Sequence, residues 1–326
     1  MGEKSDVVGV GSPLLDHLII VEEKYLDQLP GKKDGMEPVS YHDMIRIIEE
    51  SRSLPQSIAG GSCANAIKGL ASLGHSCAMI GKIGQDSVGQ KVMESFHNLG
   101  ILTLFRYSTT PTAQAVCLIT SIGERTCRTF LGAGQEMTAK DLNPSHFSGA
   151  KLVHIEGYTL LCQGVAYRAM KLAKEEGAAI SFDLGSFEVV ETYKEHILEL
   201  LEEYVDIVFS NTKETLALTG KPPKEGCGFL KNLCNISIVM VGPQGCWVGH
   251  RQEIFHCPAH PCRIVDRTGA GDLFASGFLH GFLLNKSLME SAKIGSILGG
   301  SVVEVVGAEI PPDRWPSVRL LLNQLM

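Results

Sequence analysis

The segment DRTGAGD at residues 266–272, followed by the apolar run LFASGFLHGFLL at 273–284, indicates a glycine turn that opens into a buried helix. Gly269 and Gly271 allow the backbone to pack tightly against a bulky group. Because the first N–H groups of a helix are unpaired and lie at the positive end of its dipole, the turn predicts an anion site. Asp272 adds a carboxylate there. An anion site beside a carboxylate is suited to hold a phosphoryl group while a hydroxyl group is directed at it. Alternatively, Asp272 only caps the helix.

The composition is that of an ordinary globular protein. Of 326 residues, 44% are hydrophobic and 20% charged, and the formal net charge is −7 without a long Lys/Arg tract, so we expect no nucleic-acid partner. No apolar run reaches the roughly 18 residues of a membrane span, and the first residues lack the apolar core of a signal peptide. We therefore expect a cytoplasmic protein with no membrane partner, in which the ten cysteines are reduced.

Four potential metal ligands gather shortly before residue 266. They are His256, Cys257, His260 and Cys262. Ligands this close together, with prolines between them, match no common zinc spacing. We favour a strand or turn that leads into the 266–272 segment, and zinc is the alternative.

Strand-like and helix-like segments alternate regularly from residue 151 onwards. Strands are predicted at 151–157, 178–184, 205–211 and 237–242, helices between them at 164–176, 188–203 and 213–218, and two apolar helices at 270–284 and 288–303. Such alternation predicts an α/β fold in which helices cover both faces of a parallel sheet.

The N-terminal third contains strands that do not fit this alternation. Residues 7–21 are rich in β-branched residues and interrupted by a glycine and a proline, which predicts two strand pieces with a bend between them. Residues 113–121 and 125–131 predict a β-hairpin around Gly123. We expect these extra strands to form a small separate sheet.

Ligands of open α/β sheets bind beyond the carboxyl ends of the strands, where several polar residues of this chain fall. Asp16, in the first β-rich stretch, is either a turn residue or a hydrogen-bond acceptor for a ligand. Gly61 precedes a predicted helix at 62–73 with Ser62 as its N-cap, and Asn65 lies one turn further on. This group is either a capped helix or a place where a ligand approaches the backbone and meets the amide of Asn65.

Later positions leave similar alternatives open. Asn211 and Glu214, three residues apart at a helix start, are typical of a cap pair, but an amide and a carboxylate there also suit a hydrated Mg²⁺ near phosphates. Gly242 and Gly245 form either a plain hairpin turn or a wall beside a nucleotide. Tyr158, which follows a strand, either stacks on a base or packs in the interior.

Four segments occur in the order found in a known family of small-molecule kinases. They are AGGSCANAIKGLASLG (59–74), GKIGQDSVG (81–89), SNTKE (210–214) and DRTGAGDLFASGFLHG (266–281). Together they resemble the ribokinase, or PfkB, family over essentially the whole chain. Within that family, AGGSCANAI and the GSPLLD segment at 11–16 are most similar to adenosine kinases and their bacterial relatives.

The resemblance implies a ribokinase-like three-layer α/β/α domain with a central, mostly parallel sheet and a small β-sheet lid. We expect residues 1–326 to form this single kinase domain, with the lid built approximately from 14–40 and 105–132. The lid would close over the substrate and exclude water, so that ATP is not hydrolysed idly. A monomer or a homodimer is expected.

The resemblance also implies a role for each motif residue. Asp272 would be the base that accepts the hydroxyl proton of the substrate, and the N–H groups of Ala270, Gly271 and Asp272, in the catalytic turn that includes Gly269, would stabilise the transferring phosphoryl group. The implied substrate-binding residues are Ser12, Asp16, Gly61, Ser62, Asn65 and Tyr158. Those implied for ATP and Mg²⁺ are Asn211, Glu214, Gly242, Gly245 and Arg267.

Three positions depart from the family pattern. Arg267 stands where the family usually has a small polar residue, and it either reaches the ATP phosphates or disturbs a monovalent-cation site, for K⁺, that Asp266 and Thr268 would form. Ser12 stands where animal adenosine kinases carry Asn, which removes a sugar contact. Gly35 falls near a position where those enzymes use Gln close to the base.

We therefore expect an ATP- and Mg²⁺-dependent kinase that transfers the γ-phosphate to the primary hydroxyl of a ribofuranosyl substrate, in first place a ribonucleoside such as adenosine. The alternatives are a kinase for ribose, fructose or a keto-deoxy sugar acid, and a non-catalytic nucleotide or sugar sensor. A sugar acid requires a cationic side chain in the pocket, for which Arg106, Arg125 and Arg128 are candidates. A nucleoside requires an apolar or aromatic slot.

Overall fold

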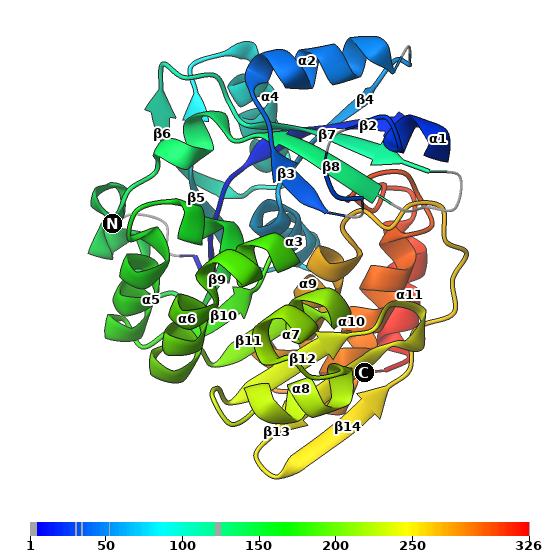
Figure 1. Cartoon of the computed structure of the whole chain (residues 1–326). Coiled ribbons are helices and arrows are strands. Elements are labelled where there is room, and N and C mark those ends of the chain that lie inside the picture. The colour runs from blue at the N-terminus through cyan, green and yellow to red at the C-terminus, as the bar shows by residue number, and fades with distance from the viewer. Residues whose placement is uncertain (1–4, 30, 34, 52, 121–124, 326) are drawn as a thin grey trace.

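Two β-sheets organise the chain, which the computed structural model describes at residues 5–29, 31–33, 35–51, 53–120 and 125–325 (Figure 1). Over these residues the larger sheet has nine strands in the order β14-β13-β12-β11-β10-β9-β1-β5-β6. Their bounds are β1 (Val7–Val10), β5 (Cys77–Gly84), β6 (Leu102–Ser108), β9 (Leu152–Glu156), β10 (Ala179–Asp183), β11 (Ile207–Asn211), β12 (Ile236–Met240), β13 (Cys246–His250) and β14 (Glu253–Cys257). The strands from β6 to β12 in that order are parallel, and β13 and β14 form an antiparallel extension.

Helices cover both faces of the larger sheet. One face carries α3 (Ser62–Ser72), α4 (Ser87–His97), α9 (Ala270–Leu283) and α10 (Leu288–Val302), and α11 (Trp315–Asn323) packs outside them. The other carries α5 (Val165–Glu175), α6 (Phe187–Glu203), α7 (Thr212–Thr219) and α8 (Pro223–Leu230). In β1, Val7 packs with the first set and Val8 with the second, because successive side chains of a strand point to opposite faces. The predicted three-layer α/β/α fold is confirmed.

The second sheet lies beyond the carboxyl ends of the parallel strands (Figure 1). Its described strands have the order β3-β8-β7-β2-β4, with bounds β2 (Leu14–Ile20), β3 (Met36–Pro38), β4 (Gln56–Gly60), β7 (Gln114–Ile119) and β8 (Arg125–Phe130). Its outer face is covered by α1 (Glu23–Leu26) and α2 (Tyr41–Glu50). The strand β4 lies outside the ranges from which we expected the lid, and residues 105–108 belong to the larger sheet. Whether the second sheet moves as a lid stays a prediction.

The predicted N-terminal strands are present. Residues 7–21 form two strands with a bend, but β1 joins the larger sheet and β2 the second, with only three residues between them. The hairpin at 113–121 and 125–131 is confirmed as the antiparallel pair β7 and β8, while Gly123 lies outside the described residues. Of the cysteine- and histidine-containing segment, His256 and Cys257 lie in the strand β14, whereas His260 and Cys262 lie in the irregular segment that leads from it toward residue 266.

Ser62 is not the N-cap of its helix, which corrects the prediction. Gly61 occupies the cap position with φ 107°, and Ser62 is the first residue of α3. A Cβ on Gly61 would lie 2.5 Å from the carbonyl oxygen of Ser12, so the left-handed backbone and the close approach both require glycine. The hydroxyl of Ser62 is therefore available to a partner outside its own helix.

The helices α9 and α10 approach each other through glycine. A Cβ on Gly277 would lie 2.7 Å from the carbonyl oxygen of Ile294, and one on Gly295 would lie 2.7 Å from that of Phe274. Although α9 is apolar over most of its length, none of the helices in the described parts of the chain has both the length and the apolar character that a bilayer crossing requires. The apolar surface of α9 is buried by α10, α3 and the larger sheet.

This contact predicts opposite effects for two alanine substitutions. Gly277→Ala should lower the free energy of unfolding by about 1–3 kcal/mol, because the new methyl group must force α9 and α10 apart. Gly300→Ala, in α10, meets its nearest atoms only at 3.5 Å and should leave stability unchanged or raise it through helix propensity. Urea unfolding of both variants measures the difference, and equal effects would contradict the close packing.

Candidate functional site

A cavity of about 970 Å³ lies between the second sheet and the carboxyl ends of the parallel strands. It is lined by all the residues to which the family resemblance gave a catalytic, substrate-binding or nucleotide-binding role, namely Ser12, Asp16, Gly61, Ser62, Asn65, Tyr158, Asn211, Glu214, Gly242, Gly245, Arg267, Gly269, Ala270, Gly271 and Asp272. Asp266 and Thr268, suggested for a cation, are buried behind the cavity wall.

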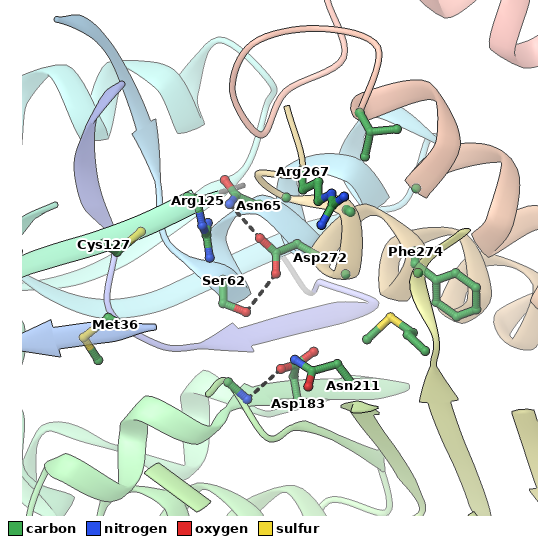
Figure 2. A pocket seen from close by; sticks show the side chains of 18 of the residues that line it. Met36, Ser62, Asn65, Arg125, Cys127, Asp183, Asn211, Arg267, Asp272 and Phe274 are labelled. Atoms are coloured by element: carbon green, nitrogen blue, oxygen red, sulfur yellow. Dashed lines mark hydrogen bonds between the residues drawn. The ribbon is translucent and has the colours of Figure 1, made fainter. Parts of the chain in front are cut away.

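Asp272 is the point at which two helix N-termini meet. Its Oδ1 accepts a hydrogen bond from Ser62 Oγ (3.0 Å) and its Oδ2 one from Asn65 Nδ2 (2.8 Å), so α3 holds the carboxylate of α9 (Figure 2). Burial raises the pKa of Asp272, and Asn65, Arg125 and Ser62 oppose the shift. The N-cap of α9 is Gly269, in a left-handed conformation, and no side chain caps it. Asp272 is therefore held by another helix and does not act as a cap.

Asp16 lies within β2 and not in a turn. Its side chain is buried at 9% exposure, and its Oδ1 accepts a hydrogen bond from Cys117 Sγ at 3.4 Å. Burial raises the pKa of Asp16 to about 6, against the opposing effects of Arg125 and Cys117. Because Asp16 also lines the cavity, its carboxylate is available to a ligand hydroxyl group.

Arg125 brings a positive charge to the same part of the cavity. It projects from β8, and Figure 2 shows it among the side chains that line the cavity. Within the described residues its side chain forms no hydrogen bond and no ion pair, yet it lowers the pKa of both Asp16 and Asp272. Of the three arginines considered from sequence, Arg106 and Arg128 do not line the cavity, and Arg128 instead donates to the carbonyl oxygens of Cys127 and Lys32.

Asn211 and Glu214 form the cap pair of α7. Asn211 Oδ1 accepts from the backbone N–H of Glu214 (3.0 Å), and Glu214 Oε2 accepts from that of Asn211 (2.8 Å). Burial, together with the nearby Asp183, raises the pKa of Glu214 to about 8. Burial, with Asp272 adding to it, raises that of Asp183 to about 7. The capping alternative is thus realised, while both carboxyl groups also line the cavity.

The opposite end of the cavity is built from turns. Gly242 and Gly245 flank a turn between β12 and β13, and a Cβ on Gly245 would lie 2.0 Å from the carbonyl oxygen of Cys257. Local packing thus already requires this glycine. Arg267 is exposed at the cavity wall, and its guanidinium donates to none of the described residues, so it is available to an anion.

Asp266 ties two segments together. Its Oδ1 accepts from the backbone N–H (2.9 Å) and hydroxyl (2.7 Å) of Thr268, and its Oδ2 accepts from the N–H of Gly307 (2.8 Å). Both oxygens are satisfied by protein donors. A cation at this place would have to share them.

A comparison with protein families identifies the chain. The model described as the pfkB family of carbohydrate kinases matches residues 52–315. The chain belongs to this family. It is a phosphotransferase that acts on an alcohol group, and its relatives are sugar kinases and nucleoside kinases.

Solved structures and curated relatives of this PfkB kinase point to two acceptor classes. The adenosine kinase from Sinorhizobium meliloti superposes with a TM-score of 0.92 at 27% identity, covering 98% of this chain and 100% of that one. A probable sugar kinase from Rhizobium etli superposes with a TM-score of 0.93 at 26% identity, covering 99% of both chains. Fructokinase-1 from Zea mays is 28% identical over 270 residues, which cover 76% of this chain and 83% of the relative.

Glu156 is a buried carboxylate of this PfkB kinase that our sequence analysis missed. It ends β9, with 1% exposure, and its oxygens accept from the backbone N–H groups of Ser12 (2.7 Å) and Cys63 (2.8 Å). It therefore fixes the bend between the two sheets to the first turn of α3. The sequence does carry a signal, because Glu156 and Asp183 both end apolar strands, and ligand-facing residues of open α/β sheets lie at such positions.

The burial of Glu156 predicts a pH dependence of stability. Burial raises its pKa from 4.5 to about 7, so between these pH values the native state holds the proton more tightly than the unfolded state. Ionisation of Glu156 thus lowers the free energy of unfolding as the pH rises through this window, by up to about 1.4 kcal/mol per pH unit. Because Glu156→Gln cannot ionise, the stability of this variant relative to wild type should rise across the window.

Urea unfolding at several pH values between the two limits tests this expectation. Glu94→Gln, at an exposed glutamate of α4, is the control and should show no such trend. A stability difference between Glu156→Gln and wild type that stays constant with pH would contradict the assignment.

Proposed function

We propose that this kinase transfers the γ-phosphate of ATP to the primary hydroxyl of a ribofuranosyl substrate, a ribonucleoside such as adenosine. The observation that carries the proposal is the Asp272 carboxylate, which Ser62 and Asn65 hold at the mouth of α9, in one cavity with Asp16. A base so fixed at a helix N-terminus has the geometry required to deprotonate a hydroxyl beside a phosphoryl group. A non-catalytic sensor would have no use for this arrangement.

In the proposed reaction the substrate hydroxyl oxygen bonds to the γ-phosphorus, and the bond from that phosphorus to ADP breaks. Asp272 takes up the hydroxyl proton, and its raised pKa makes it a better acceptor than an ordinary aspartate. The N–H groups of Gly271 and Asp272, in the first turn of α9, would stabilise the charge that develops on the transferring group, while that of Ala270 donates to the carbonyl oxygen of Arg267 (3.3 Å). Arg125, a cation without an ion-pair partner among the described residues, supports the same charge from the second sheet.

The acceptor end of the cavity supports a nucleoside. Asp16 and the amide oxygen of Asn65 are acceptors for sugar hydroxyl groups, beside the backbone of Gly61 and Ser62. Apolar and aromatic side chains are among those that line the cavity, and we expect them to form the slot for the base: Met36, Ala113, Ala115, Cys127, Leu131 and Tyr158. The hydroxyl of Tyr158 donates to the carbonyl oxygen of Gly185, which leaves its ring as a wall of the slot. Ser12 also lines the cavity, and its position in the bend is fixed by the hydrogen bond from its N–H to Glu156.

A sugar acid is the second candidate, because Arg125 is a cation in the acceptor half of the cavity. The same charge also suits the γ-phosphate, which is present whichever acceptor binds. A small sugar acid has no apolar group that would fill the slot, whereas the base of a nucleoside would fill it. We therefore favour the nucleoside.

Magnesium fits the oxygen-rich wall formed by Asp183, Asn211 and Glu214. No three acidic, histidine or cysteine side chains of the described residues converge closely enough to hold a metal by themselves. Mg²⁺ usually keeps several waters and binds one or two carboxylates plus substrate phosphates, so this donor set suits it. When bound with ATP it would neutralise phosphate charge. Gly242, Gly245 and Arg267 would border the nucleotide.

The first prediction of this proposal concerns the base. Asp272→Asn should lower kcat by about 10²–10⁴-fold, because the amide cannot take up the proton, while the Kd for ATP changes little. Steady-state kinetics and calorimetry measure the two quantities, and Asp313→Asn, at an exposed position, serves as the control. Near-normal turnover of Asp272→Asn would rule out this base.

The second prediction of this proposal concerns the acceptor substrate. In a coupled ATP-consumption screen over adenosine, ribose, fructose and a keto-deoxy sugar acid, we expect adenosine to give the highest kcat/KM. For the preferred acceptor, Asp16→Ala should raise KM by roughly ten- to a hundredfold, the effect of one buried hydrogen bond, with the Kd for ATP nearly unchanged. Equal losses for acceptor and ATP would count against Asp16, and turnover of the sugar acid alone would favour the second candidate.

A further inference from the structure

Two cysteines of the second sheet lie in contact beside the acceptor half of the cavity. Cys117 on β7 and Cys127 on β8 are directly opposite each other in the antiparallel register, with their sulfur atoms 3.4 Å apart. Directly opposite residues of an antiparallel pair have Cα separations within the range that a disulfide spans. The thiols can therefore be joined without a change of strand register.

The pair is reachable and reactive through Cys127. Its side chain lines the cavity and, two residues after Arg125, lies on the same face of β8 (Figure 2). The hydrogen bond from the Cys117 thiol lowers the pKa of Cys127, burial opposes this effect, and Arg125 adds to the lowering. Because the thiolate is the reactive form of cysteine, the geometry favours Cys127 as the sulfur that is attacked first by an oxidant small enough to enter the cavity.

The other member of the pair touches the acceptor site. Cys117 is completely buried and carries a single S–H, which can donate either to Cys127 or to Asp16 Oδ1, 3.4 Å from Cys117 Sγ. A disulfide would remove this S–H donor and draw the two sulfur atoms to about 2.05 Å. Asp16 would lose its one side-chain hydrogen-bond donor among the described residues.

We propose that Cys117 and Cys127 are a modification site, at which a peroxide forms a reversible disulfide that weakens acceptor binding. The Cys127 thiolate attacks one oxygen of hydrogen peroxide, the O–O bond breaks, and hydroxide leaves to become water. Cys117 then attacks the resulting sulfenic acid, its S–O bond breaks, and a second water leaves with the thiol proton. Two thiols are oxidised by two electrons, and the peroxide is reduced to two waters.

A second cysteine pair provides a matched control. Cys246 and Cys257 are also directly opposite each other, on β13 and β14, and both are buried. Neither lines the cavity. Oxidation of this pair would therefore leave acceptor binding unchanged, whereas oxidation of Cys117 and Cys127 would not.

The experiment treats the purified full-length kinase with hydrogen peroxide, then maps disulfides by mass spectrometry and measures kinetics before and after dithiothreitol. We expect a Cys117–Cys127 link, and an acceptor KM raised about tenfold by the loss of a hydrogen bond to a carboxylate, with the Kd for ATP unchanged. Dithiothreitol should restore the KM. The KM of Cys127→Ser should not respond to peroxide, whereas Cys246→Ser should respond as wild type does.

Failure takes distinct forms. Absence of the Cys117–Cys127 link in wild type overturns the proposal even if a serine variant does not fold. A Cys117–Cys127 disulfide that leaves the acceptor KM unchanged would overturn the effect on acceptor binding through Asp16. A peroxide response of the KM that is retained in Cys127→Ser would overturn it too. The expected effect of the disulfide on acceptor binding rests on the proposed function. If no acceptor is turned over, the proposed function fails, and the disulfide map still decides the modification site by itself.

Discussion

The site depends on one carboxylate held between two helices. Asp272 belongs to α9, but the groups that fix its orientation, Ser62 and Asn65, belong to the first turn of α3, more than 200 residues earlier in the chain. Both helices lie on the same face of the larger sheet and contact each other. Their N-termini therefore point to one place, where unpaired N–H groups and the carboxylate together meet the cavity. Any displacement of α3 against α9 would move the proposed base directly.

Much of this arrangement was predictable from local patterns. The glycine turn before Asp272, the alternation of strands and helices, and the small residues around Gly61 each have a local physical cause, and the structure contains all three. The partner of Ser62 was not predictable in this way. A serine at a helix start is normally a cap, and only the tertiary contact with α9 shows that its hydroxyl is used elsewhere.

The arginines illustrate a second limit. Whether a side chain of a strand faces a cavity depends on register, and a shift of one residue reverses every side chain. Arg125 and Arg128 are three residues apart on β8 and so lie on opposite faces, and only Arg125 lines the cavity. A sequence that shows both residues without the strand register cannot choose between them. Glu156 is a different case, because its position at a strand end is visible in the sequence, whereas its partners, the N–H groups of Ser12 and Cys63, come from distant parts of the chain.

The two walls of the cavity come from different sheets. The carboxylate of Asp272 and the turns proposed to border the nucleotide belong to the larger sheet and its helices, whereas Met36, Cys127 and Arg125 belong to the second sheet. A three-residue bend between β1 and β2 connects the two sheets. Substitutions in the second sheet, apart from those at Arg125, can thus reshape the proposed acceptor compartment without displacing the proposed base. A scaffold divided in this way can exchange one alcohol for another over evolutionary time while its chemistry stays constant.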